Sequence, residues 1–362
     1  MALSRIDTTN MIEDVPQSKL DNNINFRNII INGDMSIAQR GTSFPGLTNG
    51  NNSDYLVDRF NFSESGSESF VIDASQSTDV PSGQGFANSL KYLVDTADTS
   101  LDSLGGVALN YRFEGQMLQY LKKGTANAES LTLSFWFKSS LTGTYIAELY
   151  DKDNERTISK SYTVNTADTW EKKTVTFEGD TTGTFDNDTG RSMDLTFWFS
   201  AGSGYQSGTL QTSWGTTTTA NRAVGQVDWS ATVNNELYIT GVQLEAGTTA
   251  SDFEFLPVDV NLQRCQRYFY SNEVISNTTY WMDTYTSTTG YIVSLLSFPV
   301  TMRIRATMSY SGNWTSSNTT TSSPSFVAFS EQGYKMQARA TNSARTFIYP
   351  DGAGTLTANA EL

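Results

Sequence analysis

The amino-acid sequence predicts an all-β protein, and three observations support that class. Charged residues make up only 17% of the 362 residues while aromatic residues make up 12%, and Thr, Ser and Asn are abundant, a composition typical of strands and polar turns rather than of helices. In the best-patterned segments apolar and polar residues alternate, as they do in a half-buried strand. These segments are short, and Gly, Asn, Ser and Thr separate them, which favours an antiparallel sandwich over a parallel α/β sheet.

The alternation is clearest in two segments, residues 131–138 and 194–200, which share the pattern apolar-x-Phe-Trp-Phe. Alternation places Trp136 and Trp198 on the faces opposite to their apolar neighbours. We expect both tryptophans to pack against a neighbouring layer, and the two segments to be neighbouring or facing strands of one sandwich. The residues on the predicted buried faces are Leu131, Leu133, Phe135, Phe137, Leu195, Phe197 and Phe199.

Two further segments have patterns with a specific structural meaning. Residues 237–245 alternate as far as Gly241, where the apolar positions change face, so a β-bulge is expected at this glycine. Residues 26–41 hold two short apolar runs on either side of residues 32–34 (NGD). Because this tripeptide is a turn signal, two short strands joined by a turn are expected there.

The character of the sequence changes along the chain and predicts three parts. Residues 1–24 are polar with isolated apolar residues, and they predict an attachment arm or, alternatively, a frayed terminus. Residues 25–258 hold the strands of the sandwich. Residues 259–362 are expected to form a smaller β-rich domain, with an interdomain helix within residues 259–270. Residues 313–325 are nearly all Ser, Thr and Asn and predict a solvated loop.

The composition excludes several classes of function. The chain has no histidine, so it cannot assemble a Ser-His-Asp or Cys-His relay from its own residues or bind a metal through imidazole. The single cysteine, Cys265, has no partner for an intrachain disulfide and is expected to be a small buried residue. A net charge of −14 opposes binding to nucleic acid or to an anionic membrane surface. We expect no membrane span and no secretion signal, because no apolar run has the required length and flanks.

Several short blocks, in the same order along the chain, resemble the family of bacteriophage tail-fibre and virion-surface proteins. Residues 32–41 (NGDMSIAQRG) and 55–60 (YLVDRF) are similar to the opening of this family's module. Its carboxyl end resembles residues 238–247 (YITGVQLEAG), 253–257 (FEFLP) and 265–269 (CQRYF). The resemblance spans roughly residues 25–270, and residues 297–303 and 357–362 also look like the distal domain of such proteins.

The resemblance implies a fold and a location. In that family the segment between the blocks resembles a carbohydrate-binding-module jelly roll, to which residues 134–138 (SFWFK) and 170–177 (WEKKTVTF) are similar. The full prediction is therefore an all-β chain: a short N-terminal arm, an antiparallel jelly-roll β-sandwich and a second smaller β-rich domain. The resemblance further implies a virion component, assembled in the host cytoplasm and exposed on the particle surface, whose N-terminal arm contacts other virion proteins. Similarity to fibres implies a homo-oligomer, a trimer.

Three functional hypotheses follow. The first is a structural tail-fibre or surface adhesin-type subunit that attaches to the host and binds a surface glycan. The second is a purely architectural capsid-decoration or head-fibre subunit without a host ligand. The third is a polysaccharide depolymerase, which would need two carboxyl groups facing each other across a cleft, an arrangement that spacing in sequence does not show. We expect a protein that is not an enzyme, with no catalytic residue, no cofactor and no metal.

Aromatic residues in loop-like segments are the candidate binding residues. Tyr205, Trp214 and Trp229 are each surrounded by Gly, Ser, Thr or Asn. Sugar rings stack their C–H faces on aromatic planes, while nearby polar groups bind hydroxyls. The same residue types also serve packing within the sandwich and contacts between subunits, so three roles are open for each. Residues 180–188 hold several acidic oxygens but lack the positions of an EF-hand, and they predict an acidic turn rather than a calcium site.

Overall fold

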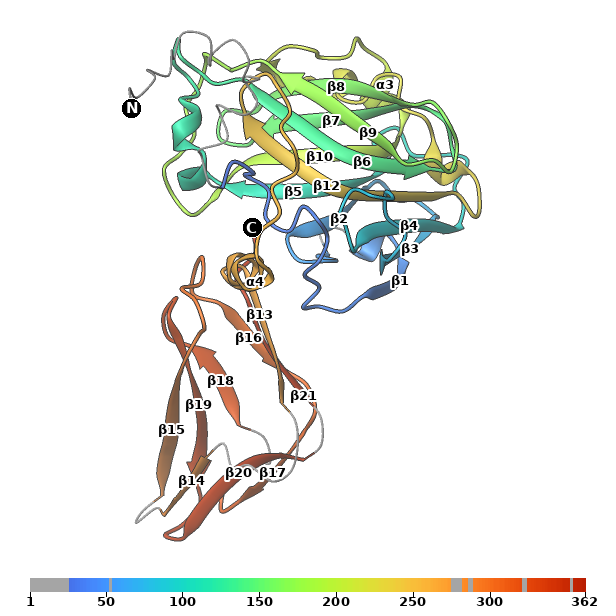
Figure 1. The fold of residues 1–362 in the computed structure, drawn as a ribbon. Coiled ribbons are helices and arrows are strands. Elements are labelled where there is room, and N and C mark those ends of the chain that lie inside the picture. Colours follow the sequence, from blue (N-terminus) through green and yellow to red (C-terminus); the bar gives the residue numbers. More distant parts are fainter. Residues whose placement is uncertain (1–25, 52–53, 275–281, 286–288, 321–323, 352–353) are drawn as a thin grey trace, which may run out of the picture.

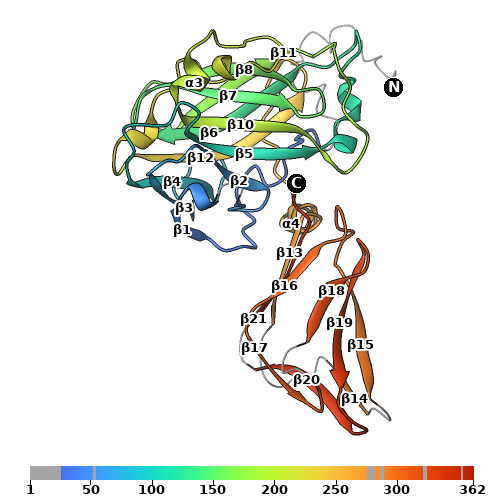
Figure 2. The same ribbon diagram turned by 180° about the vertical axis from the view of Figure 1, so that it is seen from behind.

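The computed structural model describes residues 26–51, 54–274, 282–285, 289–320, 324–351 and 354–362. The chain forms an upper β-sandwich and a lower β-rich unit, with the helix α4 between them (Figures 1 and 2). Almost all regular structure in the described part is antiparallel strand, so the predicted all-β class is confirmed. The arm predicted for residues 1–24 lies outside the described residues. The part of the chain that is described contains no helix long and apolar enough to cross a membrane.

The sandwich consists of two six-stranded antiparallel sheets, as the predicted jelly roll requires. The first sheet has the order β1 (Ser43–Leu47), β3 (Val71–Ser77), β4 (Ser89–Thr96), β12 (Glu236–Ala246), β6 (Leu131–Ser139) and β9 (Glu171–Phe177). The second has the order β11 (Gly215–Thr216), β8 (Arg156–Val164), β7 (Gly143–Asp151), β10 (Arg191–Ala201), β5 (Gly106–Glu114) and β2 (Phe60–Ser65). Strands distant in sequence are therefore neighbours, with β12 between β4 and β6.

Short helical segments lie in the connections of the sandwich. The α-helix α3 (Ser203–Gln206) follows β10 directly. The other segments are single 3-10 turns: η2 (Asn49–Asn51), η3 (Gly115–Met117), η4 (Gln119–Leu121), η5 (Thr219–Asn221) and η6 (Trp229–Ala231).

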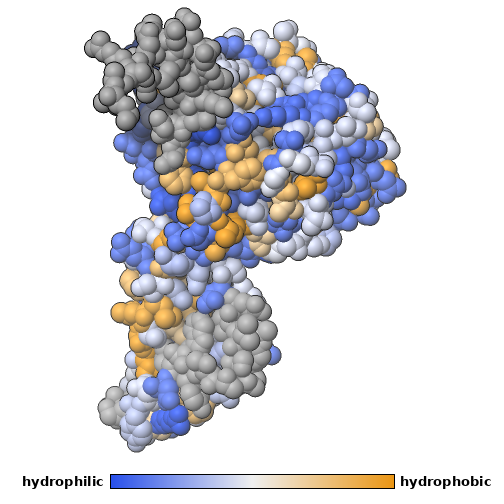
Figure 3. All heavy atoms as spheres, in the orientation of Figure 1, coloured by the Kyte–Doolittle hydropathy of each residue, from blue (hydrophilic) through white to orange (hydrophobic). Residues whose placement is uncertain are grey.

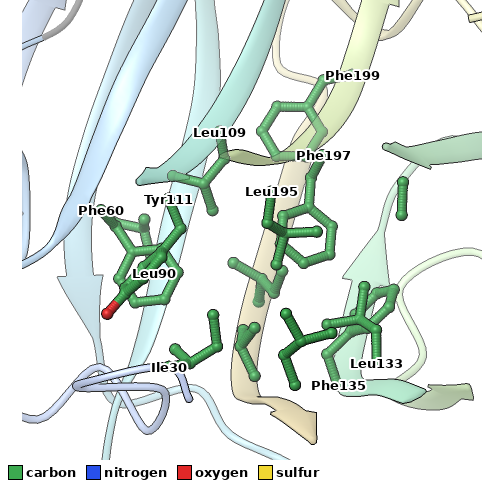
Figure 4. Packing of buried hydrophobic residues seen from close by; sticks show 14 of the residues in the cluster. Ile30, Phe60, Leu90, Leu109, Tyr111, Leu133, Phe135, Leu195, Phe197 and Phe199 are labelled. Atoms are coloured by element: carbon green, nitrogen blue, oxygen red, sulfur yellow. The ribbon is translucent and has the colours of Figure 1, made fainter. Parts of the chain in front are cut away.

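The core lies between the two sheets, and the two Phe-Trp-Phe segments meet across it (Figure 4). The rings of Phe135 on β6 and Phe197 on β10 are 5.0 Å apart at 74°. These segments are thus facing strands from different sheets, one of the two expected arrangements. Burial of each phenylalanine contributes roughly 1.5–3 kcal/mol. Because successive side chains alternate, Trp198 on β10 lies on the outer face of the second sheet.

The bulge expected in residues 237–245 is confirmed. The pairing of β12 with β6 shifts register between Thr240 and Gln243, and Gly241 has a φ of 62°. A Cβ at this glycine would also lie 2.6 Å from Cζ of Phe86. Positive φ and close contact together require glycine at this position.

The two strands expected within residues 26–41 are wrong, because this segment has no regular strand structure. Asn32 has a φ of 64°, and its side-chain amide supplies the hydrogen bonds that a strand ladder would otherwise make. Its Oδ1 accepts from the Ile37 amide at 2.8 Å, and its Nδ2 donates to the Asp58 carbonyl at 3.0 Å. Local side-chain bonding of this kind competes with secondary structure.

The lower unit follows α4 (Val258–Gln266) and consists of three three-stranded antiparallel sheets. Their orders are β13 (Phe269–Val274), β21 (Gly354–Asn359), β16 (Thr307–Tyr310); β14 (Met282–Tyr285), β20 (Arg345–Asp351), β17 (Asn313–Ser317); and β15 (Gly290–Ser297), β19 (Gly333–Ala340), β18 (Ser325–Ala328). The solvated loop expected for residues 313–325 is wrong over β17, which pairs with β20. Trp314, the second residue of β17, is buried, and its ring centroid lies 5.5 Å from that of Phe326.

A buried group of charges joins the two units, and we call it the clasp: Arg40, Asp58, Arg59, Arg303 and Glu361. Arg59 is 1% exposed and forms an ion pair with Glu361, which also contacts Arg40 at 3.2 Å. The Arg59 guanidinium lies 3.5 Å from the centroid of Tyr268. Burial opposes its charge, but the Glu361 carboxylate holds the pKa of Arg59 well above its usual value.

The last residues of the chain take part in this junction through their backbone. Arg303 donates to the carbonyl oxygens of Ala360 and Glu361, at 2.6 Å each. The Leu362 oxygen accepts from Arg112 at 2.6 Å.

The clasp also contains an acid with a shifted pKa. Burial raises the pKa of the Asp58 carboxyl to about 6. The clasp residues Arg40, Asp58 and Arg59 belong to the sequence blocks 32–41 and 55–60, so these blocks have a structural role in the junction.

Candidate functional site

The candidate site is a hollow of about 300 Å³ on the outer face of the second sheet, which we call the outer hollow. The strands β2, β5, β7 and β10 form its floor, and residues of α3 and of the segment before β12 form one side. The alternation that places Phe197 in the core places Thr196 and Trp198 in this hollow. The residues that matter for its chemistry are Asn110, Tyr150, Arg191, Trp198, Tyr205 and Arg222.

Three of these side chains form a stacked platform. The rings of Trp198 and Tyr205 lie 4.8 Å apart at 49°. The guanidinium carbon of Arg222 lies 5.3 Å from the Trp198 ring centroid and 5.6 Å from that of Tyr205. Tyr150 stands at the other side of Arg222, with its ring centroid 5.7 Å away. Arg222 is therefore held among three aromatic rings.

A fully buried carboxylate, Glu148 of β7, fixes this platform from below. Its Oε2 accepts from Trp198 Nε1 at 2.8 Å, and its Oε1 accepts from Arg222 Nε at 2.9 Å and from Thr157 Oγ1 at 2.9 Å. Burial disfavours the charge on Arg222, but the Glu148 carboxylate beside it raises the pKa of the guanidinium above its usual value. The Arg222 guanidinium is thus held charged, and both side chains are held in fixed orientation.

Polar groups complete the floor. Asn110 is 9% exposed, and its Oδ1 has no hydrogen-bond partner among the described residues. A buried polar atom without a partner costs free energy, and this oxygen itself has almost no exposed surface. Arg191 pairs with Asp194, which raises the pKa of Arg191 against the opposing effect of burial.

The three aromatic residues predicted from the sequence lie in different places. Tyr205 lines the outer hollow. Trp214 is not among the residues that line the hollow. It is half-buried, packs at the edge of the core, and donates from Nε1 to the Glu178 carbonyl at 2.7 Å. Trp229 is 0% exposed and lies 6.1 Å from Phe199 in the core. A ring without exposed surface cannot stack on a sugar, so the choice of Trp229 as a binding residue is wrong.

Other residues of the outer hollow were missed at the level of sequence. The sequence pattern did place Trp198 on the outer face of its strand, because apolar and polar residues alternate there. On that face Trp198 packs against Tyr205, as expected for a tryptophan that contacts a neighbouring layer. Arg222 and Glu148 are 74 positions apart in sequence, and neither stands in a pattern that predicts their contact. Only the topology of the second sheet brings them together.

Metal ligation finds no support in the described part of the chain, which holds no cluster of three or more His, Cys, Asp or Glu arranged for it. In the acidic turn of residues 180–188, Asp180 accepts from Arg156 at 2.7 and 2.9 Å and pairs with Lys123 at 3.1 Å. Its oxygens are therefore occupied by cations of the same chain. Cys265 is fully buried, and burial raises the pKa of its thiol well above the usual value.

Comparison with known proteins gives likenesses at the level of structure. No protein-family model matches the chain, and no curated protein matches it by sequence. The enzymatically active domain of tailspike protein 4 of bacteriophage CBA120 is similar with a TM-score of 0.32 and 15% identity, over 56% of this chain and 21% of that chain. This protein thus covers about a fifth of the tailspike chain.

Two carbohydrate-binding modules are similar to a comparable degree. The family 11 module of the cellulosomal cellulase Lic26A-Cel5E of Clostridium thermocellum has a TM-score of 0.29 and 11% identity, over 55% of this chain and 94% of that chain. A family 61 module in complex with β-1,4-galactotriose has a TM-score of 0.29 and 12% identity, over 61% of this chain and 99% of that chain. The structure itself defines the class: a jelly-roll β-sandwich with a second, smaller β-rich unit.

Proposed function

We propose that this chain is a structural protein of a bacteriophage particle, a tail-fibre or surface adhesin-type subunit that attaches to the host by binding a surface glycan in the outer hollow. The assignment to a virion rests on the sequence blocks described above. The binding role rests on one observation: the half-buried rings of Tyr205 and Tyr150 line the hollow on either hand of the Arg222 guanidinium, and Tyr205 packs on the buried Trp198.

This combination suits a carbohydrate for a physical reason. Aromatic planes stack on the C–H face of a sugar ring, and convergent polar groups bind its hydroxyls and set its orientation. A single site of this size is expected to bind weakly. Several copies on one particle would convert weak contacts into firm attachment, provided that they engage together.

The proposal predicts that Tyr205→Ala weakens binding to a bacterial surface polysaccharide by about tenfold or more, equivalent to about 1.4 kcal/mol. Tyr205 forms the exposed side of the platform, so its removal takes away stacking surface and uncovers Trp198. Biolayer interferometry against a panel of immobilised surface polysaccharides measures the effect. Trp214→Ala is the matched control, since it removes an aromatic ring outside the outer hollow and is expected to change affinity less than twofold.

The other two hypotheses give different results in the same assay. If no polysaccharide in the panel binds, the purely architectural decoration or head-fibre role is favoured and the proposal fails. If reducing ends are released from a bound polysaccharide, the chain is a depolymerase. The N-terminal arm of residues 1–24 stays a prediction: its removal should prevent incorporation into particles without loss of folding.

We also propose that two copies of the chain associate through β15 as a dimer; the trimer that similarity to fibres implies stays a separate prediction. This strand lies at the edge of its sheet and carries Tyr291, Val293 and Leu295 on its outer face, 69%, 48% and 69% exposed. Figure 3 shows hydrophobic residues gathered along the left edge of the lower unit, where β15 lies. Antiparallel pairing of two copies about Val293 would place Tyr291 of each opposite Leu295 of the other, so the edge is self-complementary.

This arrangement predicts that Leu295→Lys converts an oligomer to a monomer at micromolar concentration, because a charge on an edge strand opposes pairing. Sedimentation velocity measures the mass. Gln332→Lys, at an exposed position in the turn before β19, adds the same charge away from the β15 edge and should leave the oligomer intact. A monomeric unmodified chain, or an unchanged mass of the Leu295→Lys variant, would refute this interface.

A further inference from the structure

The outer hollow differs from the rest of the surface in its charge. The chain carries a net charge of −14, yet three arginines, Arg112, Arg191 and Arg222, line this one hollow against two acids, Glu64 and Asp194. A concentration of guanidinium groups in an acidic protein attracts an anionic ligand to that place rather than to the surface at large.

The three arginines are not equivalent. Asp194 binds Arg191 through Nε and Nη2, and Arg112 donates Nη1 to the Leu362 oxygen. Glu148 accepts a hydrogen bond from Nε of Arg222 only, and none of the described residues accepts one from its two terminal nitrogens. The side chain of Arg222 is 22% exposed. Arg222 is therefore fixed at its base and able to bind at its end.

The shape of that end restricts what it binds best. A guanidinium presents parallel N–H donors that match the two oxygens of a carboxylate, whereas a sugar hydroxyl takes one bond at a time. The rings of Trp198, Tyr205 and Tyr150 hold the plane of the fork, so little side-chain freedom is lost on binding.

We infer that the outer hollow selects acidic glycans, with the carboxylate of a uronic acid held by Arg222 and its sugar ring against Tyr205 or Tyr150. The inference rests on the proposed function, since it specifies the ligand of the same hollow. It follows that binding decreases with salt, because an exposed ion pair is screened as ionic strength rises.

The test compares acidic polysaccharides with their neutral counterparts. Polygalacturonate, alginate and hyaluronan, each with its carboxyl-reduced form, are immobilised, and affinity is measured by biolayer interferometry at low and at high NaCl. At least one acidic polymer should bind about tenfold or more tightly than its reduced form, and the difference should shrink at high salt. Equal affinity for acidic and reduced forms, abolished by Tyr205→Ala, would overturn the inference and leave the proposed function standing. Absence of binding to every polymer would count against both.

Variants of Arg222 identify the residue responsible. Arg222→Lys keeps a positive charge beside the buried Glu148, and so preserves the fold, but it removes the planar fork. It should lose most of the preference for the acidic polymer while its melting temperature stays close to that of the unmodified chain. Arg345→Lys is the matched control, since it makes the same exchange at a side chain of the lower unit that is 58% exposed. An Arg222→Lys variant that keeps the full preference would overturn the assignment.

Discussion

Replacing Glu361 by Gln is expected to lower the free energy of unfolding by about 3–5 kcal/mol, the cost of leaving a buried charge without its partner. The side chains of Arg59 and Glu361 are 1% and 4% exposed, and Arg59 pairs with this carboxylate at the junction of the two units. Without the negative charge, the Arg59 guanidinium stays buried among Tyr111 and Tyr268. Their faces attract a cation but do not replace a carboxylate.

Urea unfolding followed by tryptophan fluorescence measures this loss. Glu331→Gln is the matched control, because Glu331 is an exposed acid of the lower unit, and its replacement should change stability by less than about 0.5 kcal/mol. If Glu361→Gln costs no more than this control, the clasp does not hold the two units together.

Replacing Glu148 by Ala is expected to abolish binding in the outer hollow and to cost about 3–5 kcal/mol of stability. Glu148 is fully buried and accepts from Trp198, Arg222 and Thr157. Alanine leaves Trp198 Nε1 and Arg222 Nε without this acceptor, whereas Thr157 keeps its bond to the Leu149 carbonyl, and it opens a cavity beneath the platform. Trp198 and Arg222 would then lose their fixed orientation, although neither residue has been changed.

Under native conditions, the loss of glycan affinity caused by Glu148→Ala should be larger than the loss of folded protein. Glycan affinity and melting temperature are measured on the same preparation, with Asp95→Ala as the control, because Asp95 is exposed on β4 of the other sheet. Glu148→Gln keeps the volume and one acceptor and should fall between the unmodified chain and Glu148→Ala. A Glu148→Ala variant that is folded and binds with unchanged affinity would remove the outer hollow from consideration.

Much of the sandwich could be predicted from the sequence, because alternation directly reports which face of a strand is buried. Residues 131–138 and 194–200 illustrate this, as does the bulge at Gly241. The failures have physical causes of their own. Asn32 replaces ladder hydrogen bonds with side-chain bonds, and the Ser- and Thr-rich composition of β17 conceals a strand whose one large apolar residue, Trp314, is buried.

The candidate site was less accessible to sequence reasoning. Loop-like composition suggested Tyr205, which lines the outer hollow, but also Trp229, because neighbouring Gly and Ser do not reveal that a ring points into the core. The contact of Arg222 with Glu148 depends on the path of the chain between distant positions. Pattern predicts the face of a strand, whereas the neighbours on that face follow from topology.

Hydrogen–deuterium exchange of the full chain with and without a bound polysaccharide tests the central claim most directly. Glycan bound in the outer hollow should slow exchange of backbone amides in residues 194–198 of β10 and 203–206 of α3, which form the floor and one side of the hollow. Protection confined to those segments is the predicted result. Protection around Trp214 or in the lower unit, with residues 194–206 unchanged, would contradict it.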